Sequence, residues 1–296
     1  MLGFDNAEPI PLEEAIGGLT GKCAGILLPD ERVDMAFKAL RDRFYFTSHR
    51  IMIEDKKLLT GKMKEYKSCP YHSIKAFAVQ TAGMLDKDVE LKIYAAGLDM
   101  SIDFDKKKVD IFEIQKYISG HIFVDSMEEL LAYNEPSPQK TTTEATGGKA
   151  DKFLDYLCGD AARLDESVVE ADLKNLGAIV PSEKVKLAYK CGRDSVICTS
   201  KRLFYIDTKG IFGKQVEYLS MRYSCIKAYG VETAGSFLDR DAEFKIYTNI
   251  SQETRCLKTD LRKGQSDIME VLWFFNNQLL GMDTICLLYT SDAADE

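Results

Sequence analysis

Apolar and polar residues alternate along a long stretch of the first half of the chain. Val89, Leu91 and Ile93 fall on one side of the run VELKIY, and the residues between them are polar or amphipathic. This period of two is typical of a half-buried β-strand. Comparable runs, separated by short turns, begin at VDMAFKAL and end at DMSIDF. The pattern predicts about seven antiparallel strands.

The spacing of apolar residues then changes to that of a helix. Ile111, Ile114 and Ile118 stand at positions i, i+3 and i+7, which share one helix face. The second half of the chain ends on the same spacing, at Ile268, Val271, Phe275 and Leu279. Each half is therefore predicted to be a set of strands followed by one amphipathic C-terminal helix.

The two halves repeat one another. The run QTAGMLDKDVELKIY recurs as ETAGSFLDRDAEFKIY, and the offset of 152 residues between Thr81 and Thr233 holds without a gap from about Gly25 to Gly83. A period this long indicates a duplicated domain rather than a solenoid. We interpret the repeated triplet as a strand end that enters a hairpin, where glycine tolerates a backbone conformation that a Cβ would penalise. The structural signature residues are Gly61, Thr81, Gly83, Gly213, Thr233 and Gly235.

The repeat predicts the domain organisation. The first domain spans residues 12–133, and residues 134–150, rich in Pro, Thr and Gly, form a flexible linker. The second domain spans residues 151–285 and begins with a helix at LDESVVEADLKNL. Residues 286–296, CLLYTSDAADE, have no counterpart in the first copy and are expected to be a non-biological tail.

Several short motifs occur in both copies, and together they resemble a known family. The shared pattern runs approximately RD, FTxxR, TGK, EYxSxPYxxI and TAGxFDxDxELK; the second copy departs from it at Phe212, at Arg222 and by one extra residue after the triplet. This pattern resembles the bacterial pleckstrin-homology (PH) family. The resemblance implies a mainly β fold: two tandem PH-like barrels, each of about seven antiparallel strands plus a C-terminal capping helix. Members of that family form ring-like oligomers, so the resemblance also suggests assembly.

Charge and composition exclude some classes of function. The net charge of −8 and the pI near 5.2 argue against a nucleic-acid partner, which needs a cationic surface. We expect no transmembrane segment and no secretory signal, because no apolar run is long enough and the N-terminus has no basic start. The eight scattered cysteines form no CxxC and are expected to be reduced thiols in a cytoplasmic protein, with a Cys191–Cys198 bridge as the alternative.

No catalytic motif is present in the sequence. It holds no glycine-rich phosphate loop, no GxSxG and no HExxH. The acids Asp86, Asp88 and Glu90 lack the spacing of a calcium loop and fit a hairpin turn and a polar strand face. We therefore predict a protein with no enzymatic activity, cofactor or metal, which binds a protein partner or itself through strand edges. The two copies either pack with pseudo-twofold symmetry or bridge two partners.

The alternative function is binding of anionic phospholipid at a membrane surface. The first copy carries a basic hairpin whose side chains could contact phosphate groups. Its residues are Lys56, Lys57, Lys62, Lys64 and Lys67. The cluster thins in the second copy to Lys209 and Lys214, and a solvated hairpin explains it as well.

Overall fold

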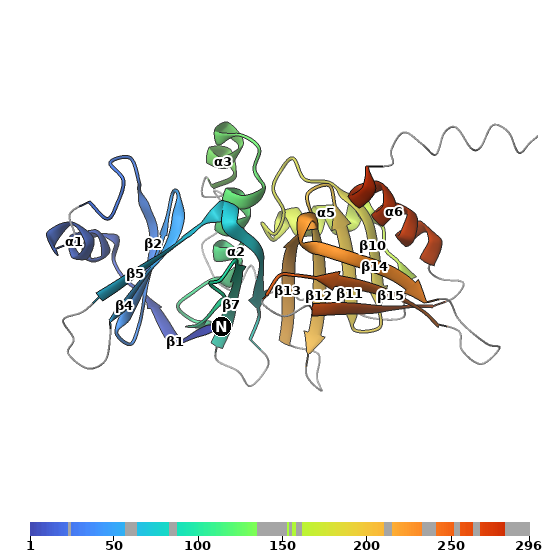
Figure 1. Ribbon diagram of the computed structural model, residues 1–296, viewed down its shortest axis with the longest axis horizontal. Helices are drawn as coiled ribbons and strands as arrows, with labels where there is room; N and C mark the ends of the chain where they lie inside the picture. Colours follow the sequence, from blue (N-terminus) through green and yellow to red (C-terminus); the bar gives the residue numbers. More distant parts are fainter. Residues whose placement is uncertain are drawn as a thin grey trace, which may run out of the picture.

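The computed structural model contains two β-rich domains that lie side by side along the long axis of the molecule (Figure 1). The structure describes residues 1–22, 25–56, 64–82, 88–134, 153, 156–157, 162–209, 215–232, 241–251, 255–262 and 267–281. The predicted linker beyond residue 134 and the predicted tail lie outside these residues.

The first domain has the predicted seven strands and C-terminal helix. Its first sheet is an antiparallel meander of β2 (Val33–Ala39), β3 (Asp42–Thr47), β4 (Arg50–Lys56) and β5 (Lys64–Pro70). After the turn η1 (Tyr71–Ser73), the second sheet is formed by β6 (Ile74–Gln80), β7 (Asp88–Ala95) and β8 (Met100–Asp105). The helices α2 (Ile111–Phe123) and α3 (Met127–Asn134) follow.

An eighth strand was not expected from the sequence. β1 (Leu2–Pro9) pairs antiparallel with β2 and parallel with β8, so it bridges the two sheets along one side. Its residues LGFDNAEP show no alternation of apolar positions, which is why the pattern gave no signal. The helix α1 (Leu12–Lys22) follows and packs Ala15 and Leu19 against Tyr45 and Met52 on the outer face of the first sheet.

The second domain repeats this plan. It comprises β9 (Ala162–Arg163), α5 (Glu166–Asn175), β10 (Val185–Cys191), β11 (Asp194–Thr199), β12 (Arg202–Lys209), β13 (Gln215–Arg222), η2 (Tyr223–Cys225), β14 (Ile226–Glu232), β15 (Asp241–Thr248), β16 (Arg255–Arg262) and α6 (Ile268–Leu280). The expected N-terminal helix is α5. Among the described residues no strand pair links β14–β16 to the other sheet, so this domain is a β-sandwich rather than a closed barrel.

The two C-terminal helices are built alike. α2 and α6 each have 13 residues, and each begins after an aspartate whose carboxylate accepts backbone N–H bonds, Asp110 in the first domain and Asp267 in the second. Such N-caps satisfy donors that a helix start leaves unpaired. Because the two helices start in the same way, residue 111 of α2 corresponds to residue 268 of α6, at an offset of 157 residues.

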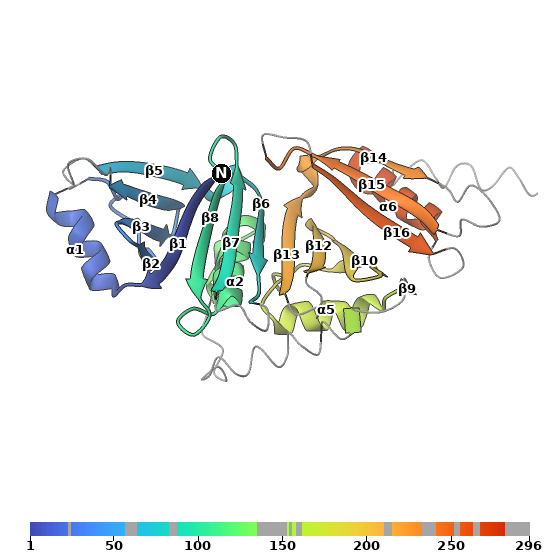
Figure 2. The same ribbon diagram turned by 90° about the horizontal axis from the view of Figure 1, so that it is seen from below.

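The domains are joined through their sheets. β6 of the first domain pairs antiparallel with β13 of the second, which produces one continuous sheet of 13 strands (Figure 2). A single hydrophobic cluster contains residues of both domains, among them Phe112, Ile114, Ile179 and Tyr218. A second cluster fills the interior of the second domain and reaches Ala76 and Ala78 of β6.

Candidate interaction surface

The contact between the two domains is called the joint below. Its first part is the pairing of the edges of β6 and β13. Ala78 lies opposite Leu219, and both are buried. Just beyond the strand, the Thr81 N–H donates to the Val216 carbonyl at 2.9 Å, and the Thr81 hydroxyl accepts from the Val216 N–H at 3.2 Å. Thr81 therefore ties the two domains together. Of the other signature residues, Gly61, Gly83, Gly213, Thr233 and Gly235 lie outside the described residues.

One face of α2 forms the second part of the joint. The Phe112 ring meets the Tyr218 ring edge to face, with centroids 5.5 Å apart. One turn further on, the aliphatic stem of Lys116 lies against Gly177, which has a φ of +67°. A Cβ at Gly177 would lie 3.4 Å from the stem and would be strained at this φ. A further turn on, Ser119 is fully buried and lies within hydrogen-bond distance of the Ala178 carbonyl.

On the side of the second domain, a buried arginine, Arg202, lies at the centre of the contacts that form the joint. The Arg202 guanidinium donates to both carboxylate oxygens of Glu183 at 3.0 Å, and both side chains are fully buried. It also donates to the Ser119 hydroxyl at 3.0 Å, and the Phe123 ring stacks on it at 4.1 Å. Because Ser119 and Phe123 belong to the first domain, Arg202 is completely covered only in the joined state.

Ion pairs surround the edge of the joint. Glu217 of β13 pairs with Lys92 of the first domain at 3.1 Å and with Lys209 of its own domain at 2.8 Å. Burial by itself raises the pKa of Glu217, but the two ammonium groups outweigh it and hold the pKa below its usual value. The carboxylate is therefore ionised at neutral pH and contributes attraction across the joint.

The joint brings together unlike edges of the two copies. By the offset of 152 residues, β14 is the counterpart of β6, and β5 is the counterpart of β13. A pseudo-twofold arrangement would have paired like edges, so the pseudo-twofold alternative is wrong. The contact is heterologous, meaning that two different surfaces of the same repeated unit meet.

β14 and β5, the counterparts of the two strands that form the joint, have exposed edges at the two ends of the molecule. Val79 of β6 and Ser220 of β13 are fully buried, whereas Val231 of β14 is half-buried and Ser68 of β5 is exposed. Among the described residues, no strand pairs with the outer edge of β5 or β14. The ends that carry these edges lie far apart along the long axis (Figure 1).

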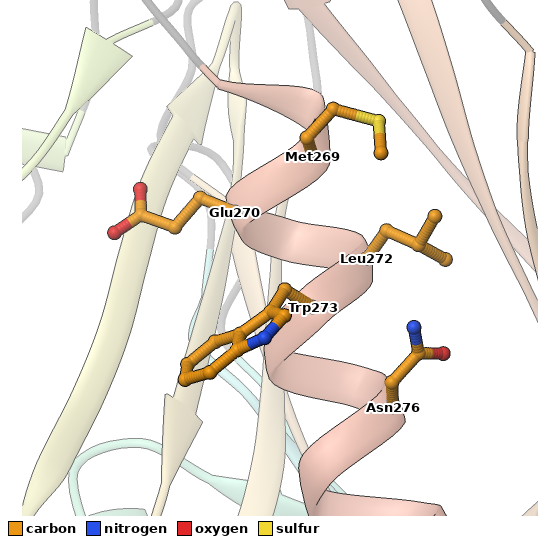
Figure 3. Close-up of a pocket in the computed structure, with 5 residues that line it drawn as sticks. All are labelled: Met269, Glu270, Leu272, Trp273 and Asn276. Carbon is orange, nitrogen blue, oxygen red and sulfur yellow. The ribbon is translucent and has the colours of Figure 1, made fainter. Parts of the chain in front are cut away.

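The exposed face of α6 is apolar and bounds a shallow pocket of about 350 Å³. Met269, Leu272 and Trp273 line it together with Glu270 and Asn276, and Figure 3 shows these side chains along two turns of the helix. The Met269 and Trp273 side chains are 57% and 53% exposed. Exposed apolar patches of this kind mark interaction surfaces more often than scattered apolar residues do.

The basic hairpin is largely neutralised where the structure describes it. Lys64 lies 2.6 Å and Lys56 lies 3.6 Å from the same buried carboxylate of Glu54. Lys67 pairs with Asp55 at 3.0 Å and also with Glu65. Lys57 and Lys62 lie outside the described residues.

The thinning of the cluster in the second copy has a structural reason. Val216 and Leu219 stand where Lys64 and Lys67 stand in the first copy, and both are buried in the joint. This replacement of two lysines by apolar residues is the sequence signal that could have located the joint.

No other chemical site emerges from the part of the chain that the structure describes. It contains no group of His, Cys, Asp and Glu residues arranged to hold a metal. The thiols of Cys191 and Cys198 are free, so the alternative disulfide is wrong. In the same part of the chain, no helix has the length and apolar character to cross a bilayer. A cytoplasmic location stays a prediction.

Comparison with known proteins identifies the family. The model of the bacterial PH domain family matches residues 13–122 and again residues 152–275. The chain belongs to the bacterial PH domain family. The two matches confirm the tandem duplication, and they agree with the position of the two sandwiches in the structure.

Relatives resemble one copy at a time. The uncharacterized protein YjqA of Bacillus subtilis (strain 168) is 46% identical over 100 residues, which covers 33% of this chain and 79% of that protein. The uncharacterized protein YozO of the same organism is 32% identical over 101 residues, 34% of this chain and 87% of that protein.

Solved structures of the same kind also match. A DUF1696 family protein with a pleckstrin-homology domain from Shewanella loihica PV-4 is 34% identical, covers 40% of this chain and 97% of its own, and gives a TM-score of 0.35. A pleckstrin homology domain from Shewanella amazonensis SB2B is 36% identical, covers 40% of this chain and all of its own, and gives a TM-score of 0.34.

Proposed function

We propose that the chain is a non-enzymatic interaction module that assembles polypeptide chains by extending its β-sheets. The observation that carries this proposal is the pairing of β6 with β13, which joins two PH-like domains edge to edge. β14 has the same place in the second domain as β6 in the first, and its outer edge pairs with no described strand. An edge of this kind presents a row of backbone N–H and C=O groups to an incoming strand.

The exposed face of α6 supports the same function. In the first domain, the C-terminal helix and the neighbouring edge of β6 are covered by one continuous partner, the second domain. In the second domain, α6 and the edge of β14 present the equivalent helix and strand, and the helix face is apolar. A partner that contacts both would bury an apolar surface and pair a strand edge at once, which gives both affinity and orientation.

A single substitution tests sheet extension. Hydrogen-bonded pairs alternate along an antiparallel ladder, and the Thr81–Val216 bond fixes that alternation at the joint. Val79, two residues earlier, then directs its N–H towards β13, and its counterpart Val231 directs its N–H towards the open edge. Val231→Pro removes that donor and places the ring at the edge, where a strand tolerates proline.

The measurement is the mass of the full chain in solution, by light scattering after gel filtration over a range of concentrations. We expect the wild type to exceed the mass of one chain as concentration rises, and Val231→Pro to remain at one chain. The control Val231→Ala keeps the N–H and should behave as the wild type. A wild type that stays at the mass of one chain up to high micromolar concentration would refute assembly.

Binding of anionic phospholipid is the second candidate, and the ion pairs of the hairpin weaken it. The ammonium groups of Lys56 and Lys64 already lie beside the Glu54 carboxylate, so less positive charge is available to phosphate groups. Co-sedimentation with phosphatidylcholine vesicles, with and without phosphatidylserine, separates the two functions. Binding that requires phosphatidylserine and is lost in Lys64→Gln would favour the lipid, whereas no binding in either case would rule out the lipid function.

A further inference from the structure

We propose that the joint holds a binding site for a phosphate group, formed by Lys75 of the first domain and by Arg222 and Lys227 of the second. The ligand is inorganic phosphate or a phosphate monoester, free in solution or carried as a lipid headgroup. The site uses side chains of a single chain, so it is independent of the proposed assembly function.

Two of these cations reach across the joint in opposite directions. Arg222 is the last residue of β13 and Lys75 is the second residue of β6, where the two strands lie side by side (Figure 2). The Arg222 Nε donates to the Ile74 carbonyl of the first domain at 3.0 Å, and the Lys75 ammonium group donates to the Asn249 carbonyl of the second at 2.9 Å. Each side chain is therefore positioned by the backbone of the other domain.

The third cation acts at the same place, which is marked by the thiol of Cys225. This thiol is buried and donates to the Lys75 carbonyl at 3.4 Å. Burial raises the pKa of the thiol, and a hydrogen bond with Ser224 lowers it in part. The positive charges of Lys75, Lys227 and Arg222 also lower this pKa, so all three converge on one point of the structure.

No carboxylate of the described residues neutralises this cluster. The segments 71–79, 222–231 and 244–251 meet around Cys225, and none of them contains Asp or Glu. Within the part of the chain that the structure describes, the three cations donate to backbone carbonyls and form no ion pair. Like charges without a counter-charge repel one another, and a bound anion removes that cost.

The carboxylates of adjoining elements are already paired. Arg202, which lies opposite Arg222 in the ladder of β12 and β13, donates to both carboxylate oxygens of Glu183. Asp125, just after α2, pairs with Lys201 at 2.6 Å. Burial lowers the pKa of Arg222, as expected of a half-buried cation that has no acidic partner among the described residues. The charge of Arg222 is therefore left for a ligand.

The donors match the geometry of a phosphate group. The Nε of Arg222 is taken by the Ile74 carbonyl, and the two terminal nitrogens form no hydrogen bond with a described residue. A guanidinium held in this way presents a planar set of donors that can bind two phosphate oxygens at once. The ammonium groups of Lys75 and Lys227 supply further charge-assisted hydrogen bonds. A dianionic phosphate balances more of this charge than a single carboxylate does.

The joint and one difference between the copies create this site. By the offset of 152 residues, Lys75 and Lys227 are counterparts, and Pro70 of the first copy stands where the second copy has Arg222. Proline has no side-chain donor, so the first copy lacks the central group of the site. The two equivalent lysines come together because unlike edges of the copies are joined. We therefore expect one phosphate group per chain.

Binding of inorganic phosphate to the full chain is the direct test, measured by isothermal titration calorimetry in a chloride buffer of constant ionic strength. Arg222→Gln and Lys227→Gln should each weaken binding more than about tenfold, because each removes a charge-assisted hydrogen bond. Arg222→Lys keeps the charge but loses the planar donors, so its affinity should be intermediate. Lys186→Gln, at an exposed position of β10, is the matched control and should bind as the wild type does.

Thermal unfolding gives a second measurement. The ligand contacts both domains, so phosphate should raise the thermal midpoint of the wild type and of Lys186→Gln. Phosphate also stabilises proteins without binding, by exclusion from their surface, and that part of the rise is common to all variants. The part of the rise that Arg222→Gln and Lys227→Gln lose is the contribution of the site.

Two results would overturn the proposal. One is a wild type that takes up no phosphate at tens of millimolar, and the other is binding that persists unchanged in Arg222→Gln or in Lys227→Gln. Lys227 is exposed, and its ammonium group donates to the Ser224 carbonyl of its own domain. Lys227→Gln therefore keeps the test decisive even if circular dichroism shows that Arg222→Gln does not fold.

Vesicles identify the source of the phosphate group. Phosphatidylcholine vesicles that contain phosphatidic acid present a phosphate monoester at a membrane surface. Sedimentation with these vesicles that is lost in Arg222→Gln and reversed by inorganic phosphate assigns the ligand to a lipid headgroup. Absence of sedimentation, with phosphate binding in solution intact, assigns it to a small soluble anion.

Discussion

Gln115 is expected to weaken the joint between the domains rather than to stabilise it. The residue lies on α2 between Phe112 and Ser119, on the helix face that contacts the second domain. Its side chain is fully buried, and neither its amide nitrogen nor its amide oxygen finds a hydrogen-bond partner among the described residues. The equivalent residue of α6 is Leu272. We predict that Gln115→Leu stabilises the protein.

The magnitude follows from the cost of burying a polar group without a partner. A buried amide that loses its hydrogen bonds costs about 1–3 kcal/mol. Leucine has a similar volume, and the change of shape in a packed core costs less than about 1.5 kcal/mol. The net effect is a gain in the free energy of unfolding of about 1 kcal/mol, because the leucine also buries apolar area at about 25 cal/mol per Å².

Urea unfolding measures this gain. The single tryptophan, Trp273, reports on the second domain by fluorescence, and far-ultraviolet circular dichroism reports on both domains. We expect the midpoint to rise with an unchanged denaturant slope, which indicates a change in stability alone. Gln115→Ala removes the same amide but leaves a cavity, so it should gain less or lose stability. A lower midpoint in Gln115→Leu would show that the amide is satisfied and would refute the reasoning.

Three other substitutions test the same picture. Arg202→Met leaves Glu183 buried without its partner and should lower the free energy of unfolding in urea by about 3–5 kcal/mol. Arg50→Met, which breaks the equivalent pair with Glu31, should cost less because the Arg50 side chain is 22% exposed. Equal costs would contradict the covering of Arg202 by the joint. Thr81→Val removes the side-chain bond to the second domain and should lower the free energy of unfolding by about 1 kcal/mol in the same urea titration. No change would mean that this bond contributes nothing to the joint. Burial, followed by neighbouring carboxylates, raises the pKa of Asp103 from 3.8 to about 6, so the cost of ionising this group in the folded state grows as the pH rises from about 4 to 6 and is fully present above that range. Asp103→Asn should therefore raise the thermal midpoint at pH 8, and the gain should fade as the pH falls towards 4; a gain independent of pH would refute this assignment.

The sequence pattern predicted most of the fold because burial in a sheet imposes a period of two. β7 is an example: Val89, Leu91 and Ile93 are all buried, as their alternation required. The helix spacing predicted α2 and α6 for the same reason, since one stripe of each helix covers a core. The repeat supported each of these predictions a second time, at an offset of 152 residues up to Gly83 and of 157 residues at the C-terminal helices.

The pattern failed where the partner of an element is set by distant parts of the chain. β1 lies between β2 and β8, and its residues gave no alternation. The joint had a signal, the exchange of Lys67 for Leu219, but on sequence grounds this exchange resembled a thinning basic cluster. Only the register of β13 against β6 shows that the leucine is buried by another domain.

The choice of edges has a consequence for any duplicated domain. If two copies of a unit join through like edges, both edges are consumed and the pair is closed. This chain joins β6 to β13, which are unlike edges, and among the described residues no strand pairs with the outer edges of their counterparts, β14 and β5. Arg50 and Arg202 each donate to both carboxylate oxygens of a glutamate, Glu31 and Glu183, but the Arg50 side chain is 22% exposed whereas that of Arg202 is fully buried beneath the first domain. Duplication with a heterologous joint thus leaves one counterpart of each joined edge outside the joint, whereas a joint between like edges would leave none.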